Sequence, residues 1–266
     1  MADVLVVKLG GAAGLNLEAA LADLAQVAAG RPVVIVHGVS ERMAVLSAER
    51  GMAVEVLVSP AGHESRYTPP SVRDLFVEAA SQINAEIVAG LNGHGTPAIG
   101  LIDSFVLSGT RKDAVRAVVN GRIRVIRDDY TGAITGVEPA LIDEALAAGQ
   151  VAVVPPLAAS ADGPLNVDGD RAAAAVAGAI GASDLVILSN VRGLYRQFPD
   201  EATFVGEVHR ADVAGALDWA AGRMKRKVLG AQAALDSGVR RVVIGDGRRD
   251  APVQAALAGE GTVFTR

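Results

Sequence analysis

Five short apolar runs, separated by longer stretches of helical character, constrain the fold more than any other feature of the sequence. They are rich in Val, Ile and Leu and read DVLVVKL (3–9), PVVIVHG (32–38), VAVVPP (151–156), DLVILSN (184–190) and RRVVIG (240–245). Apolar runs without polar alternation are typical of strands that are buried on both faces of a sheet. Strands that alternate with helices predict a largely parallel sheet with helices on both sides, which places the chain in the α/β class.

The remaining elements follow from apolar spacing and turn residues. Helices are expected at 17–29, 71–91, 138–148, 170–181 and 224–237, with strand and loop over 54–68 and a strand at PAIGLID (97–103). Ser40 stands where it would cap the helix after the second run. The pair Asn120-Gly121 is a strong two-residue turn signal, so 115–126 is expected to form a β-hairpin. Any boundary between two lobes is expected near residue 182.

Composition argues against several classes of protein. The chain has 266 residues, 50% of them apolar and only 3% aromatic, so it can bury a large core of small side chains. Without cysteine it can form no disulfide and no thiolate metal site. The apolar runs fall short of the ~20 residues of a membrane span, and the first residues lack the basic segment of a signal peptide. We therefore expect a cytoplasmic protein, and its net charge of −5 argues against nucleic-acid binding.

The first strand ends in a pattern that favours phosphate binding. Lys8 lies at the carboxyl end of the strand, and Gly10 and Gly11 lead into the first helix. Ligands of open parallel sheets bind at strand carboxyl ends. Glycines let backbone N–H groups approach an anion, and a helix N-terminus adds favourable polarity. On local grounds alone, a tight turn with no ligand explains the same residues.

The second strand ends in the same way, at His37 and Gly38. A histidine here could serve as a general base, but a histidine that ties down its own loop is the simpler interpretation. The histidines, at positions 37, 63, 94 and 209, show no metal-ligand spacing, so we expect no protein metal site.

Two further segments concentrate charge at the starts of helices. Asp168 and Asp170 in LNVDGD precede an alanine-rich helix, where either could cap the helix or orient cationic side chains. The segment lacks the distal glutamate of a calcium loop. Lys225, Arg226 and Lys227 lie at the start of the helix after GRM, where the helix dipole disfavours positive charge. Such a cluster indicates a nearby anion or, equally well, a solvated turn.

The segment RKDAVRAVVNGRIRVIR (111–127) carries six basic residues and one acidic residue in an acidic chain. A hairpin whose charges keep an edge soluble is one interpretation; a docking surface for an acidic partner is the other. In the hairpin, Arg122 and Arg124 alternate with Ile123 and Val125, so we expect both arginines on one face and the apolar pair packed inward. The docking surface would further include Arg111, Lys112 and Arg116, with Arg116 on the same face as the two arginines.

Taken in order, VVKLGG, VVIVHG, SRYT, LNVDGD, LVILSNVRGL and GRMKRKV resemble the amino acid kinase superfamily, and within it the acetylglutamate kinase branch. The resemblance covers essentially the whole chain. It implies a three-layer αβα sandwich with a largely parallel central sheet. It also implies an acceptor-binding lobe at about 1–182 and a nucleotide-binding lobe at about 183–266.

The resemblance assigns catalytic roles to Lys8, Lys227 and Asp170. The two lysines match those that neutralise the transferring phosphoryl group, and Asp170 matches the aspartate that holds them in place. Gly10 and Gly11 match the glycines that face the nucleotide phosphates. No general base is implied, because a carboxylate acceptor is already ionised at neutral pH.

For the acceptor, the resemblance implies contacts from Arg66, Asn166 and the loop Gly38, Val39 and Ser40. Arg66 matches an arginine that binds the α-carboxylate of the substrate. HGVS stands where the family has HGGG, so Val39 and Ser40 must keep a negative φ if their N–H groups are to donate hydrogen bonds to the acceptor.

For the nucleotide, the segment 189–194 matches the family's nucleotide loop. The residues expected to contact the nucleotide are Ser189, Asn190, Gly193 and Leu194. Asn190 stands where relatives often carry aspartate.

GHESRYT, NGRIRVIRDDYTG and GRMKRKVLGA further resemble the members that phosphorylate α-aminoadipate on a small acidic carrier protein, whose C-terminal glutamate bears the substrate. The implied reaction uses ATP and Mg²⁺ to form an acyl phosphate, in lysine or arginine biosynthesis; glutamate on the same carrier stays open as an acceptor. The resemblance leaves two alternatives, an acetylglutamate kinase and a non-catalytic regulator that binds nucleotide and amino acid. We expect a homodimer.

Overall fold

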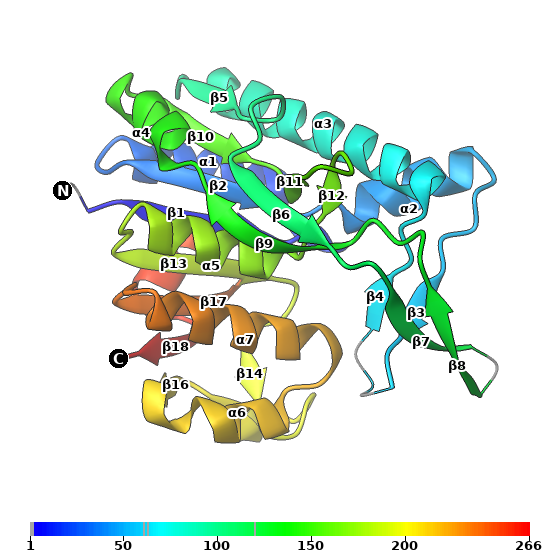
Figure 1. The fold of residues 1–266 in the computed structure, drawn as a ribbon. Coiled ribbons are helices and arrows are strands. Elements are labelled where there is room, and N and C mark those ends of the chain that lie inside the picture. Colours follow the sequence, from blue (N-terminus) through cyan, green and yellow to red (C-terminus); the bar gives the residue numbers. More distant parts are fainter. Residues whose placement is uncertain (1–2, 61, 63, 120) are drawn as a thin grey trace.

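A central eight-stranded sheet organises the computed structural model, which describes residues 3–60, 62, 64–119 and 121–266 (Figure 1). Its strand order is β16-β18-β17-β13-β1-β2-β10-β5. The strands are β1 Leu5–Leu9, β2 Val33–His37, β5 Ala98–Gly100, β10 Val151–Val154, β13 Asp184–Ser189, β16 Glu207–His209, β17 Arg241–Asp246 and β18 Thr262–Thr265. Every neighbouring pair is parallel except β17 and β18. The prediction of a largely parallel sheet is confirmed.

Helices cover both faces of this sheet and complete three layers (Figure 1). They are α1 Leu17–Ala28, α2 Ser40–Glu49, α3 Pro70–Gly93, α4 Pro139–Ala147, α5 Gly169–Ala179, α6 Val213–Trp219, α7 Gly222–Asp236 and α8 Pro252–Leu257. Alternate residues of β1 serve opposite faces. Val6 packs in a cluster with residues of α4, α5 and α7, whereas Val7 packs in a cluster with residues of α1, α3 and α8.

Smaller sheets lie on one side of the sandwich. A four-stranded sheet, in the order β12-β11-β6-β9, contains β6 Leu107–Arg111, β9 Gly132–Val137, β11 Leu157–Ala159 and β12 Leu165–Asn166. The pairs β3 Val56–Val58 with β4 Glu64–Arg66, and β7 Val115–Val119 with β8 Arg122–Ile126, project together beyond the sandwich (Figure 1). The short strands β14 Leu194–Tyr195 and β15 Phe204–Val205 form a further pair.

The predicted hairpin at 115–126 is therefore present. Gly121 has a φ of +73°, as a tight turn requires, while Asn120 lies outside the described residues. Two other expectations were wrong. Ser40 is the first residue of α2 rather than its cap, since Val39 holds the cap position and makes no side-chain hydrogen bond there. The strand predicted over 97–103 covers only 98–100, because the chain turns away after Leu101 bonds to Val153.

The two halves of the central sheet come from different parts of the sequence. β13, β17, β18 and β16, all after residue 183, form one half, and β1, β2, β10 and β5 form the other. The assignment of acceptor and nucleotide to these halves stays a prediction. Within the described residues, no helix is both long enough and apolar enough to cross a membrane.

The loops that follow β1 and β2 touch backbone to backbone. A Cβ on Gly11 would lie 2.4 Å from the carbonyl carbon of Gly38, and a Cβ on Gly38 would lie 2.5 Å from the nitrogen of Gly11. No side chain fits at either position, because the neighbouring atoms are backbone and cannot rotate away. This contact fixes the carboxyl ends of two central strands against each other.

We therefore expect Gly38→Ala to lower the free energy of unfolding by at least ~1–3 kcal/mol, the usual cost of overpacking. The matched control is Gly215→Ala within α6, where an added Cβ meets nothing within 4 Å. That change should be neutral or stabilising by up to ~1 kcal/mol, because alanine favours helix. Chemical denaturation of both variants measures the difference, and equal stabilities would contradict the close contact.

Candidate active site

A buried carboxylate between two buried lysines forms the centre of the site. Lys8 Nζ lies 3.0 Å from Asp170 Oδ1, and Lys227 Nζ lies 3.5 Å from Oδ1 and 3.4 Å from Oδ2. The three side chains come from the carboxyl end of β1, the first turn of α5 and the second turn of α7. The structure thus brings together the three residues predicted to be catalytic, which are separated by up to 219 positions in the chain (227 − 8).

Small residues allow this approach. A Cβ on Gly230 would lie 3.1 Å from the carbonyl oxygen of Asp170, so α7 can pack closely on α5 only with glycine or a very small shift there. A Cβ on Gly169 would lie 3.4 Å from Lys8 Cε. Glycine at 230 therefore sets how closely α7, and with it Lys227, approaches Asp170, whereas a Cβ at 169 would make only an ordinary van der Waals contact with Lys8.

The triad carries one excess positive charge in a buried place. Burial by itself raises the pKa of Asp170, but the charges of Lys8 and Lys227 and the hydrogen bonds they donate hold it below its usual value. Burial and repulsion by Lys8 lower the pKa of Lys227 to about 8, although Asp170 opposes this shift. An anion that entered the site would relieve the repulsion between the lysines.

A second feature of the candidate site is the set of backbone N–H groups in the loops after β1 and β2. Val39 has a φ of −133°, and neither Val39 nor Ser40 is among the residues with positive φ. The substitution of HGVS for HGGG therefore leaves the backbone unstrained. Within the described part of the chain, the N–H groups of Gly11, Val39 and Ser40 have no backbone partner. They remain available to an anion at the start of α2.

His37 is buried and already engaged. Its Nδ1 lies 3.4 Å from the carbonyl oxygen of Gly38, and Asn84 Nδ2, which also donates to Val153, lies 3.3 Å from its Nε2. Burial lowers the pKa of His37 to about 4, the Gly38 carbonyl opposes this shift, and Lys8 adds to it. These contacts confirm the simpler interpretation that the histidine ties down its own loop.

Asp168 is the N-cap residue of α5. Its Oδ1 accepts from the backbone N–H groups of Asp170 and Arg171, both at 3.0 Å, and its Oδ2 lies 3.7 Å from Arg226. The capping role considered for Asp168 is confirmed, and it fixes the start of the helix that carries Asp170. Lys225 and Arg226 are exposed, whereas Lys227 is buried in the triad.

Two of the predicted acceptor residues, Arg66 and Asn166, lie in one hydrogen-bonded unit. Asn166 Nδ2 donates to Thr68 Oγ1 at 3.1 Å, and Thr68 Oγ1 donates to the carbonyl oxygen of Arg66 at 3.0 Å. Partial burial and repulsion by Arg223 lower the pKa of Arg66. Neither arginine forms an ion pair with any residue that the structure describes. The position of Arg223, four residues before Lys227 on α7, was not predicted from the sequence.

The predicted nucleotide loop lies against the glycine loop after β1. Asn190 Nδ2 lies 3.4 Å from the carbonyl oxygen of Ala13, and buried Ser189 accepts from the N–H of Gly247 at 2.7 Å. The N–H of Leu194 donates to Thr262 Oγ1 at 2.8 Å, and its side chain belongs to the core. The side chain of Asn190 is therefore exposed and can contact a ligand, whereas the side chain of Leu194 is buried.

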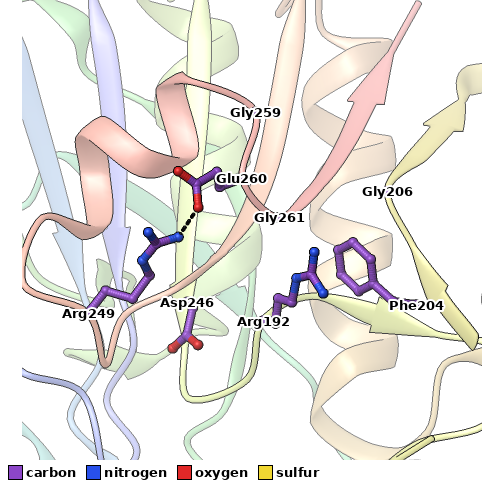
Figure 2. Close-up of a pocket in the computed structure, with 8 residues that line it drawn as sticks. All are labelled: Arg192, Phe204, Gly206, Asp246, Arg249, Gly259, Glu260 and Gly261. Carbon is purple, nitrogen blue, oxygen red and sulfur yellow. Dashed lines mark hydrogen bonds and ion pairs between the residues drawn. The ribbon is translucent and has the colours of Figure 1, made fainter. Parts of the chain in front are cut away.

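A cavity of about 310 Å³ opens beside this loop, at the carboxyl ends of β13 and β17 (Figure 2). Its lining residues are Arg192, Phe204, Gly206, Asp246, Arg249, Gly259, Glu260 and Gly261. The Arg192 guanidinium stacks 3.9 Å above the Phe204 ring, and Arg249 is paired with Glu260 (Figure 2). Apart from Arg192, which falls within 189–194, none of these residues was expected to line a site, because strand-end loops of unremarkable sequence supply them.

The basic segment divides between two elements. Arg111 ends β6, where its guanidinium lies 4.5 Å from the centre of the Tyr130 ring and its Nε lies 3.6 Å from Asp162. Lys112 is exposed just after it. The other predicted docking residues lie on the hairpin β7–β8.

The predicted orientation of the hairpin was wrong in two respects. Arg122 and Arg124 do share one face, but Arg116 is paired with Val125 and lies on the opposite one. Ile123 and Val125 do not pack inward: they are 62% and 54% exposed. Buried Ala117, paired with Arg124, makes the arginine face the inner one, and long arginine side chains extend past it to solvent. Period-two alternation fixes which residues share a face, not which face turns inward.

Metal ligands are not gathered anywhere in the described ranges: no group of three or more His, Cys, Asp or Glu side chains there could hold an ion. Both oxygens of Asp170 already face lysines. A Mg²⁺ ion bound with a nucleotide would therefore be held by phosphate oxygens rather than by this carboxylate.

Known proteins resemble this chain over almost its whole length. The profile of the amino acid kinase family matches residues 3–246. A LysW-aminoadipate kinase of Deinococcus radiodurans is 42% identical over 268 residues, covering 99% of this chain and 92% of that protein. A LysW-aminoadipate kinase of Thermus thermophilus is 42% identical over 267 residues, covering 98% and 99%. The N-acetylglutamate synthase of Neisseria gonorrhoeae, solved with coenzyme A and N-acetyl-glutamate, superposes with a TM-score of 0.80 at 26% identity, covering 99% of this chain and 59% of that one.

Asp170→Asn should strongly destabilise the protein, because it leaves two buried ammonium groups without a counter-charge. Removing one partner of a buried pair typically costs about 3–5 kcal/mol. The deficit should shrink as the pH rises toward about 8. Without the Asp170 charge, the pKa of Lys227 falls below its wild-type value of about 8, so the variant loses this buried charge at a pH where the wild type keeps it. Above about pH 8 both proteins have lost it, and the deficit should stay constant. Thermal unfolding across this pH range measures the effect.

The matched control adds Lys227→Met to Asp170→Asn and so removes one of the unpaired charges. This double variant should recover part of the stability at pH 7. A deficit independent of pH, with no recovery in the double variant, would contradict the electrostatic account of the triad.

Proposed function

Because the chain belongs to the amino acid kinase family, we propose that it transfers the γ-phosphoryl group of ATP to the side-chain carboxylate of α-aminoadipate held on an amino-group carrier protein. The product is an acyl phosphate, and ADP leaves. The observation that carries this proposal is the buried triad of Lys8, Asp170 and Lys227, with its excess positive charge beside free backbone N–H groups. The printed names of the relatives supply the acceptor.

The geometry supports catalysis by positioning and charge neutralisation. An ionised carboxylate attacks phosphorus in line and needs no general base. His37 is buried, its ring nitrogens contact Gly38 and Asn84, and its pKa of about 4 makes it too weak a base to be assigned that role. Lys8 and Lys227 neutralise charge on the transferring group, and Asp170 holds both lysines in place. Mg²⁺ supplies further charge neutralisation between the phosphates when it is bound with ATP.

The proposed acceptor residues lie outside the triad, on β4, β12 and the start of α2. Arg66, which has no ion-pair partner in the described structure, binds the α-carboxylate of aminoadipate as a fork of two N–H donors. Asn166 donates a further hydrogen bond to the acceptor. The N–H groups of Val39 and Ser40 approach the carboxylate that is phosphorylated.

The carrier is acidic and bears aminoadipate on its C-terminal glutamate. It docks on the hairpin β7–β8, where Arg122 and Arg124 are exposed on one face and three apolar residues, Val118, Ile123 and Val125, are 40%, 62% and 54% exposed on the other. A small free acceptor needs no such projecting surface, which argues against a plain acetylglutamate kinase. A regulator without turnover would not need both lysines of the triad.

The direct test compares ATP turnover with carrier-linked aminoadipate, carrier-linked glutamate and free acetylglutamate. We expect the carrier-linked aminoadipate to give by far the highest kcat/KM. Lys8→Ala serves as the matched inactive enzyme, and its kcat should fall ~10²–10³-fold, because a charge that stabilises the transition state is lost. Equal use of acetylglutamate, or a near-normal kcat for Lys8→Ala, would reject the proposal.

The docking surface has its own test. Arg122→Glu with Arg124→Glu should lower kcat/KM strongly for the intact carrier adduct and little for a short peptide that ends in the same modified glutamate. The loss should shrink at high salt, because the Debye length falls from about 10 Å at 0.1 M to about 3 Å at 1 M.

Val118→Glu, on the opposite face of the same hairpin, is the control for general damage to the hairpin. Val118→Glu should lower kcat/KM for the intact carrier adduct only if the apolar face of the hairpin also contacts the carrier. If the arginine reversal affects both acceptors equally, or neither, the hairpin does not dock the carrier.

A further inference from the structure

Thr68, the last residue of the SRYT motif, is completely buried and fully hydrogen-bonded. Its Oγ1 donates to the carbonyl oxygen of Arg66 at 3.0 Å and accepts from Asn166 Nδ2 at 3.1 Å. One hydroxyl therefore joins the two residues assigned to the acceptor, which lie 100 positions apart in the chain (166 − 66). The hydroxyl can do this because it is a donor and an acceptor at once.

The backbone of Thr68 is held as firmly as its side chain. Its N–H donates to Asp129 Oδ1 at 2.8 Å, and its carbonyl accepts from the N–H of Tyr130 at 2.7 Å. Asp129 is itself 2% exposed, and Thr131 donates to its second oxygen. Three separate segments, around residues 66–68, 129–131 and 166, thus form one unit in which Thr68 contacts the other two.

This unit also reaches the base of the hairpin. Asp128 and Asp129 lie just beyond β8, separated from it by Arg127, and the Tyr67 hydroxyl donates to both carboxylate oxygens of Asp128 at 2.8 Å. The segment that leaves the hairpin is therefore tied to Tyr67 and Thr68, the two residues that directly follow β4 and Arg66. The two bonds of Oγ1 explain why a hydroxyl, rather than a methyl group of the same shape, is buried at position 68.

We propose that the Thr68 hydroxyl is a specificity-determining positioning device, which holds Arg66 and Asn166 at the spacing that the acceptor requires. The inference rests on the proposed function and deepens it. Thr68 touches no substrate; it acts through the two residues that do. The α-carboxylate of the acceptor then meets an arginine whose backbone is fixed and an asparagine whose amide orientation is fixed.

Removing the hydroxyl should affect the acceptor and leave the nucleotide unaffected. Thr68→Val keeps the shape but removes both bonds of Oγ1, so Asn166 can rotate and Arg66 loses one anchor. A misplacement of about 1 Å can cost ~10²-fold, so we expect acceptor KM to rise ~10–100-fold. ATP KM should not change, because the bonds of Asn190, Ser189 and the triad do not involve Thr68.

Thr68→Ser is the matched control, since it keeps the hydroxyl and loses only the methyl group. Its acceptor KM should stay close to that of the wild type. The rise in Thr68→Val should be the same with the carrier adduct and with the short peptide, because the defect lies in the acceptor site and not in docking. Thermal unfolding of both variants reports their stability; should Thr68→Val not fold, Thr68→Ala is compared with Thr68→Ser in its place.

The outcomes separate this inference from the proposed function. Absence of turnover of carrier-linked aminoadipate by the wild type would reject the proposed function. Normal turnover by the wild type, with an unchanged acceptor KM in Thr68→Val, would overturn the role of Thr68. Equal losses in Thr68→Val and Thr68→Ser, or equal rises in the KM of acceptor and ATP, would show a packing role only and would overturn it as well.

Discussion

Asp170 is the contact on which the arrangement of the catalytic centre depends. Its carboxylate lies between two ammonium groups that are buried with it, and each lysine belongs to a different element of the sandwich. A buried charge needs a partner, so β1, α5 and α7 must come together for any of the three residues to be accommodated. The same requirement leaves one positive charge uncompensated. In the proposed function, a phosphoryl group supplies the missing negative charge during transfer.

The acceptor side relies on neutral hydrogen bonds instead. Arg66 and Asn166 come from β4 and β12, two short strands outside the central sheet. Short strands hold their residues weakly, and the buried hydroxyl of Thr68 compensates by joining them. In the proposed function, the chemistry of phosphoryl transfer thus lies on the rigid sandwich, while recognition of the acceptor lies on smaller elements that are fixed by side-chain bonds.

Much of this could be predicted from the sequence, because the buried strands have few alternatives. Runs such as VVIVH can only be central strands, and glycine after them indicates close backbone contact. The partners of Lys8 were predicted by resemblance, since no local pattern links residues 8, 170 and 227. The orientation of the hairpin was predicted wrongly, because packing of Ala117 against the rest of the chain is a tertiary effect. Arg223, on α7, and the cavity lining, from strand-end loops, were missed for the same reason: only the tertiary fold brings these residues to their neighbours.

The two projecting hairpins have a consequence for how such an enzyme can diversify. β7 and β8 are paired with each other and not with the central sheet, so their outer residues can change, and the turn can lengthen, without disturbing the buried core. Selection can therefore act on partner choice and on chemistry almost independently. The exception is the stem at residues 128 and 129, which accepts hydrogen bonds from Tyr67 and Thr68, just after β4. Evolutionary drift should be fast at the tip of the hairpin and slow at its stem.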